Sequence, residues 1–406
     1  MKKLKMVLVA LVIIAIVATV AVTLVSCSSD KGTVKIGLIT LHDSSSTYDK
    51  NFIDALNVAK ADLEAEGYKV ETIVKSGIPE SDDCYQAAAD LVDQGCSIIF
   101  ADSFGHEDYM IKAAKEFTNV TFCHATGTKA HTEKLANYHN AFASIYEGRY
   151  LAGVAAGMKL AELYGEGNGA NVSAANAKVG YVGAFTYAEV ISGYTSWFLG
   201  VQSIVPAATM EVKFTGSWYD PTAEKEAANT LIANGAKLVS QHADSMGAPT
   251  ACDEAGIPNV TYNVSTKADC ANTYVIASRI NWAPYYKTVV KAVLAGETLA
   301  YDYVGTLATG SVEVLEVGTA AAAGTAEKIA EVKAKIISGE LKIFDTTKFT
   351  VGGSAKTEYL ADVDTDAAFT PDTQVIANGV FEESKYRSAP YFDLKIDGIT
   401  LLNTAF

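Results

Sequence analysis

Short apolar runs alternate with longer amphipathic stretches along most of the chain, beginning at Val34. The runs are rich in β-branched residues and are bounded by turn residues, which predicts strands at 34–41, 70–75, 97–101 and 120–124. The stretches between them carry apolar residues at helical spacing and predict helices at 51–66, 85–94 and 107–117. Strands that alternate with helices form a parallel sheet with helices on both faces. The pattern therefore predicts an α/β fold.

The same order of elements starts again in the second half of the chain. Residues 178–181 (Lys-Val-Gly-Tyr) resemble 35–38 (Lys-Ile-Gly-Leu), and 231–239 resemble 91–99. Two matches in the same order indicate two lobes of similar construction, each a parallel sheet flanked by helices. This is the architecture of two-lobed, type I periplasmic-type binding proteins. A chain of 406 residues is also too long for one core and suits two domains.

The lobe boundaries depend on where the chain crosses between the two sheets. We place three hinge crossings at residues 140–146, 275–280 and 301–307. These crossings divide the chain into an N-terminal lobe and a C-terminal lobe, with the bounds 34–143 plus 276–303 and 144–275 plus 304–406. The tail from about Gly318 contains an Ala-rich helix through Ile337 and then strands or loops. No function is predicted for this tail.

The start of the chain has the composition of an export segment. Lys2, Lys3 and Lys5 precede an apolar run over residues 6–25, and small residues follow it. Residues 24–27, Leu-Val-Ser-Cys, resemble the bacterial lipobox, which implies a signal peptide at 1–26, lipidation of Cys27 and a tether at 27–33. The alternative is a transmembrane helix, because the apolar run is long enough to span a bilayer. The polar Ser-Ser-Asp-Lys-Gly after Cys27 favours the lipoprotein.

Charge and cysteine content exclude several function classes. The formal net charge is −15, and it becomes −18 once the three signal-peptide lysines are removed. Such an acidic chain argues against binding to nucleic acid or to anionic lipid. The five cysteines after Cys27 are widely spaced and odd in number, which indicates buried free thiols, with a Cys252–Cys270 bridge as the alternative. No Cys/His spacing indicates a metal site, and no cofactor is expected.

The loops after the predicted strands are the candidate binding segments. In open parallel sheets, ligands bind outside the carboxyl ends of the strands. In two facing lobes these ends meet across one cleft. The nominated segments are 41–48, 102–105, 124–127, 184–189, 217–221, 241–246 and 262–265.

Motifs at these strand ends resemble the basic membrane protein (BMP) family, whose lipoproteins include purine nucleoside receptors of ABC uptake systems. The motifs are Asp-Ser-Ser-Ser-Thr-Tyr-Asp-Lys-Asn-Phe at 43–52, Ser-Phe-Gly at 103–105, Tyr-Glu-Gly-Arg-Tyr-Leu-Ala-Gly at 146–153, Gly-Ser-Trp-Tyr-Asp-Pro at 216–221 and Asn-Trp-Ala-Pro-Tyr-Tyr at 281–286. The resemblance covers roughly residues 34–300. It implies a monomeric, lipid-anchored binding protein on the extracytoplasmic face of the cell membrane. It also implies a purine base or nucleoside as ligand and ABC permease and ATPase subunits as partners.

In the family that the chain resembles, a purine lies between two aromatic rings, one from each lobe. The matching positions in this chain are Phe52 and Trp218. Stacking a flat heterocycle on an aromatic ring contributes about 1–3 kcal/mol. Phe52 is alternatively a core residue, because Leu56 and Leu63 share its helix face. Trp218 follows a strand and precedes Tyr-Asp-Pro, where a large ring is hard to bury.

Two positions bear on the choice between free base and nucleoside. Asp43 matches the family's acidic residue near the sugar or base edge, with a loop or helix cap as the alternative. Nucleoside-binding members have an Asp-rich stretch where this chain has Asn263 and Ser265. An amide offers a donor and an acceptor side by side, as in Asn recognition of adenine. The departure favours a free purine base, and nucleoside binding is the alternative.

The remaining candidates for ligand contact lie at the same strand ends: Tyr48, Phe104, Glu189, His242 and Asp244. Glu189 is alternatively a cap of the following helix, and a lone histidine such as His242 is usually structural. Residues 281 and 282, Asn-Trp, are expected to support the hinge and the core.

The sequence argues against catalysis. Asp43 and Asp244 could form a carboxylate pair across the cleft. However, the chain has no Gly-x-Ser-x-Gly elbow and no GxxxxGK[ST] phosphate loop. We therefore predict a non-enzymatic binding protein that feeds a permease, with a ligand sensor for a signalling partner as the alternative.

Overall fold

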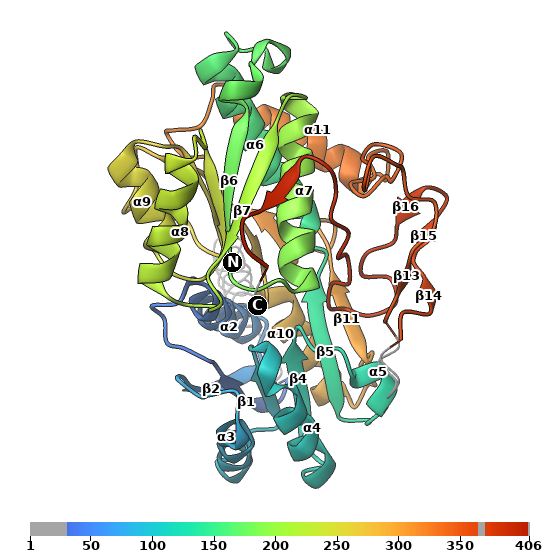
Figure 1. Ribbon diagram of the computed structural model, residues 1–406. Coiled ribbons are helices and arrows are strands. Elements are labelled where there is room, and N and C mark those ends of the chain that lie inside the picture. Colours follow the sequence, from blue (N-terminus) through green and yellow to red (C-terminus); the bar gives the residue numbers. More distant parts are fainter. Residues whose placement is uncertain (1–30, 364–369, 405–406) are drawn as a thin grey trace, which may run out of the picture.

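The computed structural model describes residues 31–363 and 370–404 of the 406-residue chain. The predicted signal peptide at 1–26 and the predicted lipidation site Cys27 lie outside the described residues. Within the described residues no helix is long and apolar enough to cross a membrane. The two predicted lobes are both present, one above the other in Figure 1.

The first lobe is built on a six-stranded sheet in which every pairing is parallel, in the order β11-β5-β4-β3-β1-β2. Its strands are β1 Thr33–Ile39, β2 Lys69–Lys75, β3 Ile98–Ala101, β4 Thr121–Ala125, β5 Tyr138–Ala143 and β11 Asp302–Gly305. One face is covered by α2 Thr47–Ala65 and α10 Ala283–Ala295. The other face is covered by α3 Asp82–Asp93 and α4 Glu107–Glu116. The short helices η1 Phe104–His106 and α5 Ala130–Glu133 follow β3 and β4.

The second lobe has a seven-stranded sheet in the order β12-β10-β9-β8-β6-β7-β17, in which β12 alone runs antiparallel to its neighbour. Its strands are β6 Lys178–Gly183, β7 Thr209–Phe214, β8 Val239–His242, β9 Asn259–Tyr262, β10 Tyr274–Ile280, β12 Val312–Val314 and β17 Ile399–Leu401. Helices α6 Tyr146–Tyr164 and α7 Ala188–Ile204 cover one face, and α8 Pro221–Ala233 and α9 Gly247–Ala255 cover the other. The short turns η2 Gly169–Asn171 and η3 Ala174–Asn176 precede β6, and α11 Thr325–Ile337 packs on α6.

The internal repeat read from the sequence reflects an equivalent packing in both lobes. Gly37 on β1 and Gly180 on β6 occupy matching central strands. A Cβ at Gly37 would lie 2.7 Å from Leu91 Cδ1, and one at Gly180 would lie 2.9 Å from Leu231 Cβ. Each glycine therefore lets the leucine of a covering helix sit directly on the strand. This confirms the prediction of two lobes of similar construction.

The three crossings between the lobes lie partly outside the predicted segments. The first runs through residues 144–145, between β5 and α6, as expected. Residues 276–280 belong to β10 and pair with β9 and β12, so the second crossing follows at 281–282. Residues 304–305 belong to β11 of the first sheet, so the third crossing is at 306–311. The predicted bounds change accordingly, because ladder pairing holds these residues in their own sheets.

Polar contacts connect the crossings to one another. The side-chain amide of Asn51 on α2 donates to Ile280 O at 2.8 Å, and Asn281 Nδ2 donates to Gly310 O at 3.1 Å. Trp282 is 1% exposed and stacks on Phe52 with ring centroids 4.4 Å apart. Residues 281 and 282 therefore support the hinge and the core, as predicted.

The tail after α11 folds over both lobes. We name residues 338–363 and 370–398 the C-terminal strap. It contains two small hairpins, formed by β13 Leu360–Ala361 with β14 Thr373–Gln374 and by β15 Ile376–Ala377 with β16 Val380–Phe381. In Figure 1 it lies to the right of α7 and reaches down toward β11. Its end leads into β17, which pairs with β7 and forms one edge of the second sheet.

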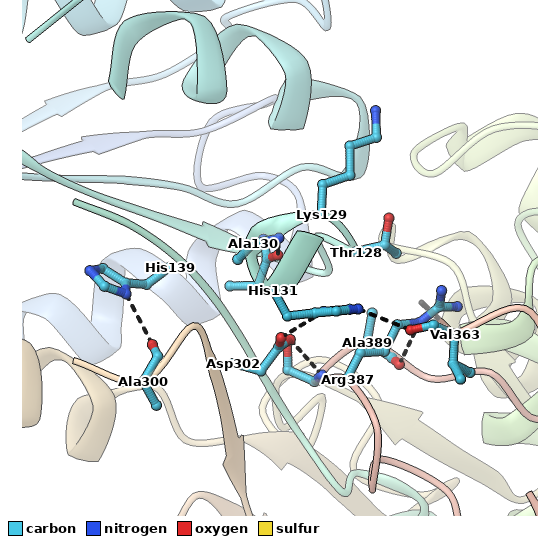
Figure 2. A network of polar contacts seen from close by, with 12 residues as sticks. Thr128, Lys129, Ala130, His131, His139, Ala300, Asp302, Val363, Arg387 and Ala389 are labelled. Atoms are coloured by element: carbon cyan, nitrogen blue, oxygen red, sulfur yellow. Dashed lines mark hydrogen bonds and ion pairs between the residues drawn. The ribbon is translucent and has the colours of Figure 1, made fainter. Parts of the chain in front are cut away.

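A polar network fixes the strap to the first lobe (Figure 2). Asp302 Oδ1 accepts hydrogen bonds from the backbone N and the Oγ of Ser388, each at 2.7 Å. His131 lies 3.0 Å from Asp302 Oδ2 through Nδ1 and 3.0 Å from Val363 O through Nε2. Both partners are acceptors, so this geometry requires a proton on each ring nitrogen. The hydrogen bond to Asp302 accordingly raises the pKa of His131.

The described cysteines are buried free thiols, as the odd number and wide spacing predicted. Cys252 and Cys270 are both unbridged, so the alternative disulfide is not formed.

Candidate functional site

A narrow pocket lies between the two lobes. Its lining comes from loops at the carboxyl ends of strands in both sheets, together with the first turn of α2. The first lobe contributes Leu41, His42, Tyr48, Asp49, Ser103, Phe104 and Thr126. The second lobe contributes Glu189, Trp218, His242 and Asp244.

The first-lobe wall is formed where α2 begins, four residues earlier than the sequence pattern predicted. Ser46 is the N-cap, and its side chain accepts from Asp49 N at 3.3 Å. This cap brings Tyr48 into the first turn, where its hydroxyl donates to Asp102 O at 2.9 Å. The Tyr48 hydroxyl is therefore used within its own lobe, and its ring faces the pocket.

Asp49 is held by neighbours within the first lobe. Its Oδ1 accepts from His42 N at 2.8 Å, and its Oδ2 accepts from Ser46 Oγ and lies 3.5 Å from His42 Nδ1. Burial opposes ionisation of Asp49, but the hydrogen bonds from His42 and Ser46 outweigh it and lower the pKa. Asp49 is thus an ionised carboxylate whose oxygens are occupied by its own loop.

The second-lobe wall places a histidine between a carboxylate and an aromatic ring. His242 Nε2 lies 3.2 Å from Glu189 Oε1, which requires Nε2 to carry the proton and donate. Burial lowers the pKa of His242, so the imidazole is neutral at neutral pH. Its ring lies 6.4 Å from that of Trp218. Glu189 belongs to the first turn of α7, makes no capping hydrogen bond there and lines the pocket.

Asp244 is a buried acid of the pocket. Burial raises its pKa well above the usual value, and nearby Glu224 raises it further. Its backbone N donates to Trp218 O at 2.9 Å, which ties the loop after β8 to the loop after β7. A carboxyl group in this position can form a hydrogen bond with a ligand N–H or O–H that reaches it.

Glu224 supports the two loops that follow β7 and β8. It is fully buried on α8 and accepts from Asp220 N at 3.2 Å and from Ser245 N at 3.1 Å. Burial raises the pKa of Glu224 to about 7. Asp220 in turn caps α8 by accepting from Thr222 N and Ala223 N at 3.0 and 2.9 Å. Sequence reasoning missed Glu224, although an Asp-Pro helix start followed by a Glu signals a carboxylate that reaches back to the cap.

The cleft is closed in this structure. Ring pairs cross it between His42 and Tyr219, with centroids 5.4 Å apart, and between Phe104 and Tyr187, 5.7 Å apart. Thr47 N of the first lobe also donates to Asp244 O of the second at 2.7 Å. The lobes therefore touch directly on their cleft faces.

Three predicted ligand residues do not line the pocket. Phe52 is 0% exposed and packs in the first-lobe core between Trp282 and Phe100, because it shares the inward face of α2 with Leu56. Asp43 is exposed, and its carboxylate accepts from Ser45 N and Ser45 Oγ, which is the loop-capping role given as its alternative.

Asn263, the third of these residues, lies behind Asp244. Its Nδ2 is 3.5 Å from Asp244 Oδ1, and its φ of +67° is a left-handed conformation that asparagine tolerates better than most residues. Asn263 therefore supports an acid of the pocket and does not itself read a ligand edge.

The other six predicted residues, Tyr48, Phe104, Glu189, Trp218, His242 and Asp244, do meet at one pocket. The lining residues that were not singled out are Leu41, His42, Asp49, Ser103 and Thr126. All of these except Asp49 lie in a nominated strand-end segment. The 262–265 segment contributes nothing to the lining. Among the described residues no group of His, Cys, Asp and Glu is placed to hold a metal ion.

Comparison with known proteins identifies relatives across most of the chain. The sequence profile of the family described as Bmp, ABC transporter substrate-binding protein PnrA-like, matches residues 36–347. A purine-binding protein of Brucella abortus is 32% identical over 283 residues, which cover 70% of this chain and 75% of the relative. A putative ABC transporter glucose-binding protein of Haloferax volcanii is 30% identical over 252 residues, 62% of this chain and 60% of the relative.

Solved structures share the fold at lower sequence identity. An ABC transporter solute-binding protein from Conexibacter woesei superposes with a TM-score of 0.62 at 19% identity, over 76% of this chain and 98% of that one. A solute-binding protein from Aeropyrum pernix gives 0.62 at 16% identity, over 76% and 92%. These structures confirm the predicted two-lobed fold. Most of the C-terminal strap lies beyond the residues that the family profile matches.

Proposed function

Because this chain belongs to the Bmp family of PnrA-like ABC transporter substrate-binding proteins, we propose that its cleft binds a purine for uptake. Proteins of this family are non-enzymatic, act outside the cytoplasm, and deliver a small molecule to permease and ATPase subunits. The observation that carries the purine proposal is the second-lobe wall, where Trp218 stands beside His242 and the acids Glu189 and Asp244. The name of the Brucella relative supports the same ligand class.

The groups of this wall match the chemistry of a purine. A planar heterocycle gains about 1–3 kcal/mol from stacking on an aromatic ring such as Trp218. The N–H groups at the ring edge need acceptors, and the carboxyl groups of buried Asp244 and partly buried Glu189 supply oxygens. Tyr48 and Phe104 close the opposite side with apolar ring surface.

We favour a free base over a nucleoside. A ribose diol needs a second acceptor apart from those that serve the ring. Asp43, which the family resemblance assigned to this role, faces solvent and is engaged by Ser45, and Asp49 is engaged by His42 and Ser46. Asn263 does not line the pocket, so its amide does not bear on the choice between base and nucleoside.

A sugar is the second candidate. One relative is named a putative glucose-binding protein, and carboxylates beside a tryptophan also accept hydrogen bonds from vicinal hydroxyls. The number of cleft aromatics favours the purine, since Tyr48, Phe104 and Trp218 offer ring surface from both lobes.

The test is a ligand panel on the protein without its first 26 residues. Adenine, guanine, hypoxanthine, their ribosides and glucose are compared by thermal shift and by calorimetry. A bound ligand at a hundred times its Kd stabilises the native state by about 2.7 kcal/mol, which gives a clear rise in Tm. We expect the free bases to bind most tightly. Binding of ribosides alone reverses the preference for the base, and binding of glucose alone refutes the purine.

The anchor and the assembly state complete the proposal. We expect a monomer that is tethered by lipid at Cys27, so that residues 27–33 hold the lobes beside the permease. Incorporation of radiolabelled palmitate tests this, with Cys27→Ala as the comparison. Equal labelling of both proteins refutes the anchor.

A further inference from the structure

Two exposed aromatic rings meet across the cleft beside the pocket. Phe104 of the first lobe is 44% exposed and Tyr187 of the second is 41% exposed, with ring centroids 5.7 Å apart. Phe104 also lines the pocket, so the pair stands where the pocket opens to solvent. Each of these rings finds its partner on the opposite lobe.

The first-lobe ring is held in place by a carboxylate from a neighbouring loop. Glu80 Oε1 accepts from Ser103 Oγ at 2.6 Å and from Gly105 N at 2.7 Å, one residue on either side of Phe104. A Cβ at Gly105 would lie 2.5 Å from Glu80 Cδ, so glycine is what allows this approach. His124 Nε2 lies 2.7 Å from Ser103 O and adds a third restraint.

The second-lobe ring rests on the ligand wall. Tyr187 stacks on Phe185 with centroids 5.1 Å apart and an interplanar angle of 12°. Phe185 in turn meets the edge of Trp218 at 5.0 Å. A ligand that orders Trp218 therefore also orders the platform from which Tyr187 reaches Phe104.

We propose that Phe104 and Tyr187 form a clasp that sets the rate of ligand release, and that Glu80 is the positioning residue for Phe104. The inference rests on the proposed ligand-binding function of the same cleft. The pair exists only when the lobes are closed, so it stabilises the closed state over the open one. A ligand enters the open cleft before the clasp forms, and it leaves after the clasp has broken. The clasp thus acts mainly on the dissociation rate.

The decisive measurement is stopped-flow dissociation, with adenine, guanine and hypoxanthine as probes. Replacing one ring of an aromatic pair should raise koff about two- to tenfold in Phe104→Leu and in Tyr187→Leu, with kon within about twofold. The double variant should release no faster than the faster single variant, because both lose the same contact. The clasp is overturned if koff is unchanged in the single variants. It is also overturned if the fold-increase in koff of the double variant equals the product of the two single fold-increases.

Glu80 is tested by a matched pair of variants. Glu80→Gln keeps an acceptor oxygen for Ser103 and Gly105 and should release at nearly the wild-type rate. Glu80→Ala should reach the rate of Phe104→Leu, with Tm lowered more in the presence of ligand than in its absence, because faster release weakens binding. Tyr301→Leu removes an exposed aromatic ring of the first lobe outside the pocket and should leave koff unchanged. Equal koff for Glu80→Gln and Glu80→Ala refutes the positioning role.

A wrong ligand assignment can be distinguished from a wrong clasp. If the wild type binds none of the probes, the proposed function fails, and the clasp is decided on the ligand-free protein. Spin labels at Asp93→Cys on α3 and Asn229→Cys on α8, both exposed positions, report the distance between the lobes. The double variant Phe104→Leu with Tyr187→Leu should shift the distances toward an open state. An unchanged distance distribution overturns the clasp.

Discussion

In the first lobe the polar groups that face the cleft already have partners inside the lobe, whereas in the second lobe the acids retain capacity for a ligand. Asp49 is held by His42 and Ser46, and the Tyr48 hydroxyl is held by Asp102 O. Across the cleft, the side chain of Asp244 has one long contact of 3.5 Å with Asn263 among the described residues. The difference indicates a division of labour, in which the second lobe recognises the ligand and the first lobe covers it.

The division of labour between the lobes predicts the largest loss of ligand affinity at Trp218. Trp218→Ala removes the stacking surface of the second lobe and should weaken purine affinity by about 1–3 kcal/mol, up to two orders of magnitude in Kd. Tyr48→Phe is the matched first-lobe change, and it should alter Kd by less than about threefold because the ring is kept. Calorimetry on both variants decides the matter. Equal losses would mean that the lobes contribute alike.

A smaller loss is expected at Asp244. Asp244→Asn keeps one acceptor oxygen but replaces the other carboxyl oxygen by an amide NH₂ donor, which should cost about 1 kcal/mol, or roughly fivefold in Kd. Asp43→Asn changes an exposed acid outside the pocket and serves as the control, with no change in Kd. A loss in the control as large as in Asp244→Asn would return Asp43 to the ligand site.

Asp49 should separate stability from affinity. Asp49→Asn weakens the hydrogen bonds from His42 and Ser46 at the start of α2 and should lower the free energy of unfolding by about 1 kcal/mol. The change in Kd should be under twofold, because those oxygens are not available to the ligand. Urea unfolding and calorimetry on the same variant measure the two quantities. An unchanged unfolding curve with a weakened Kd would place Asp49 among the ligand contacts.

The smallest effect concerns the strap and depends on pH. The pKa of His131 is raised in the folded protein by its bond to Asp302, so its contribution to stability is present below its ordinary pKa of 6.5. That contribution is lost as pH rises through the folded-state pKa. The difference in unfolding free energy between wild type and His131→Asn should therefore shrink from pH 5.5 to pH 8.5. A constant difference would show that the imidazolium does not hold the strap.

Much of this organisation could be predicted from the sequence, because it depends on the spacing of apolar residues and on which residues follow the strands. The alternation of elements, the repeat at Gly37 and Gly180, and the strand-end rule follow from local pattern, and the rule nominated all but one of the lining residues. Trp218 and Asp244 were reached in this way. These features need no knowledge of how side chains pack in three dimensions.

The errors have a common physical origin. Motif matching placed Phe52 in the cleft, but on a helix that begins at Thr47 its ring turns into the core and Tyr48 faces the pocket. The start of that helix depends on the Ser46 cap, a hydrogen bond that apolar spacing does not reveal. Asn263 was assigned to ligand reading on its chemistry, whereas its backbone conformation explains the residue. Glu224 was missed because its role appears only when two distant loops meet.

Neither lobe is continuous in the sequence, and this has a consequence for folding. β5 ends at residue 143, but α10 and β11, which complete the first lobe, do not begin until 283 and 302, and the edge strand β17 of the second lobe begins at 399. In a chain that folds as it emerges outside the cytoplasm, the first lobe stays incomplete until these later segments have also crossed the membrane. Until then Phe52 lacks its Trp282 cover and β5 has an unpaired edge. The emerging chain is therefore expected to need protection from aggregation until its last third has crossed.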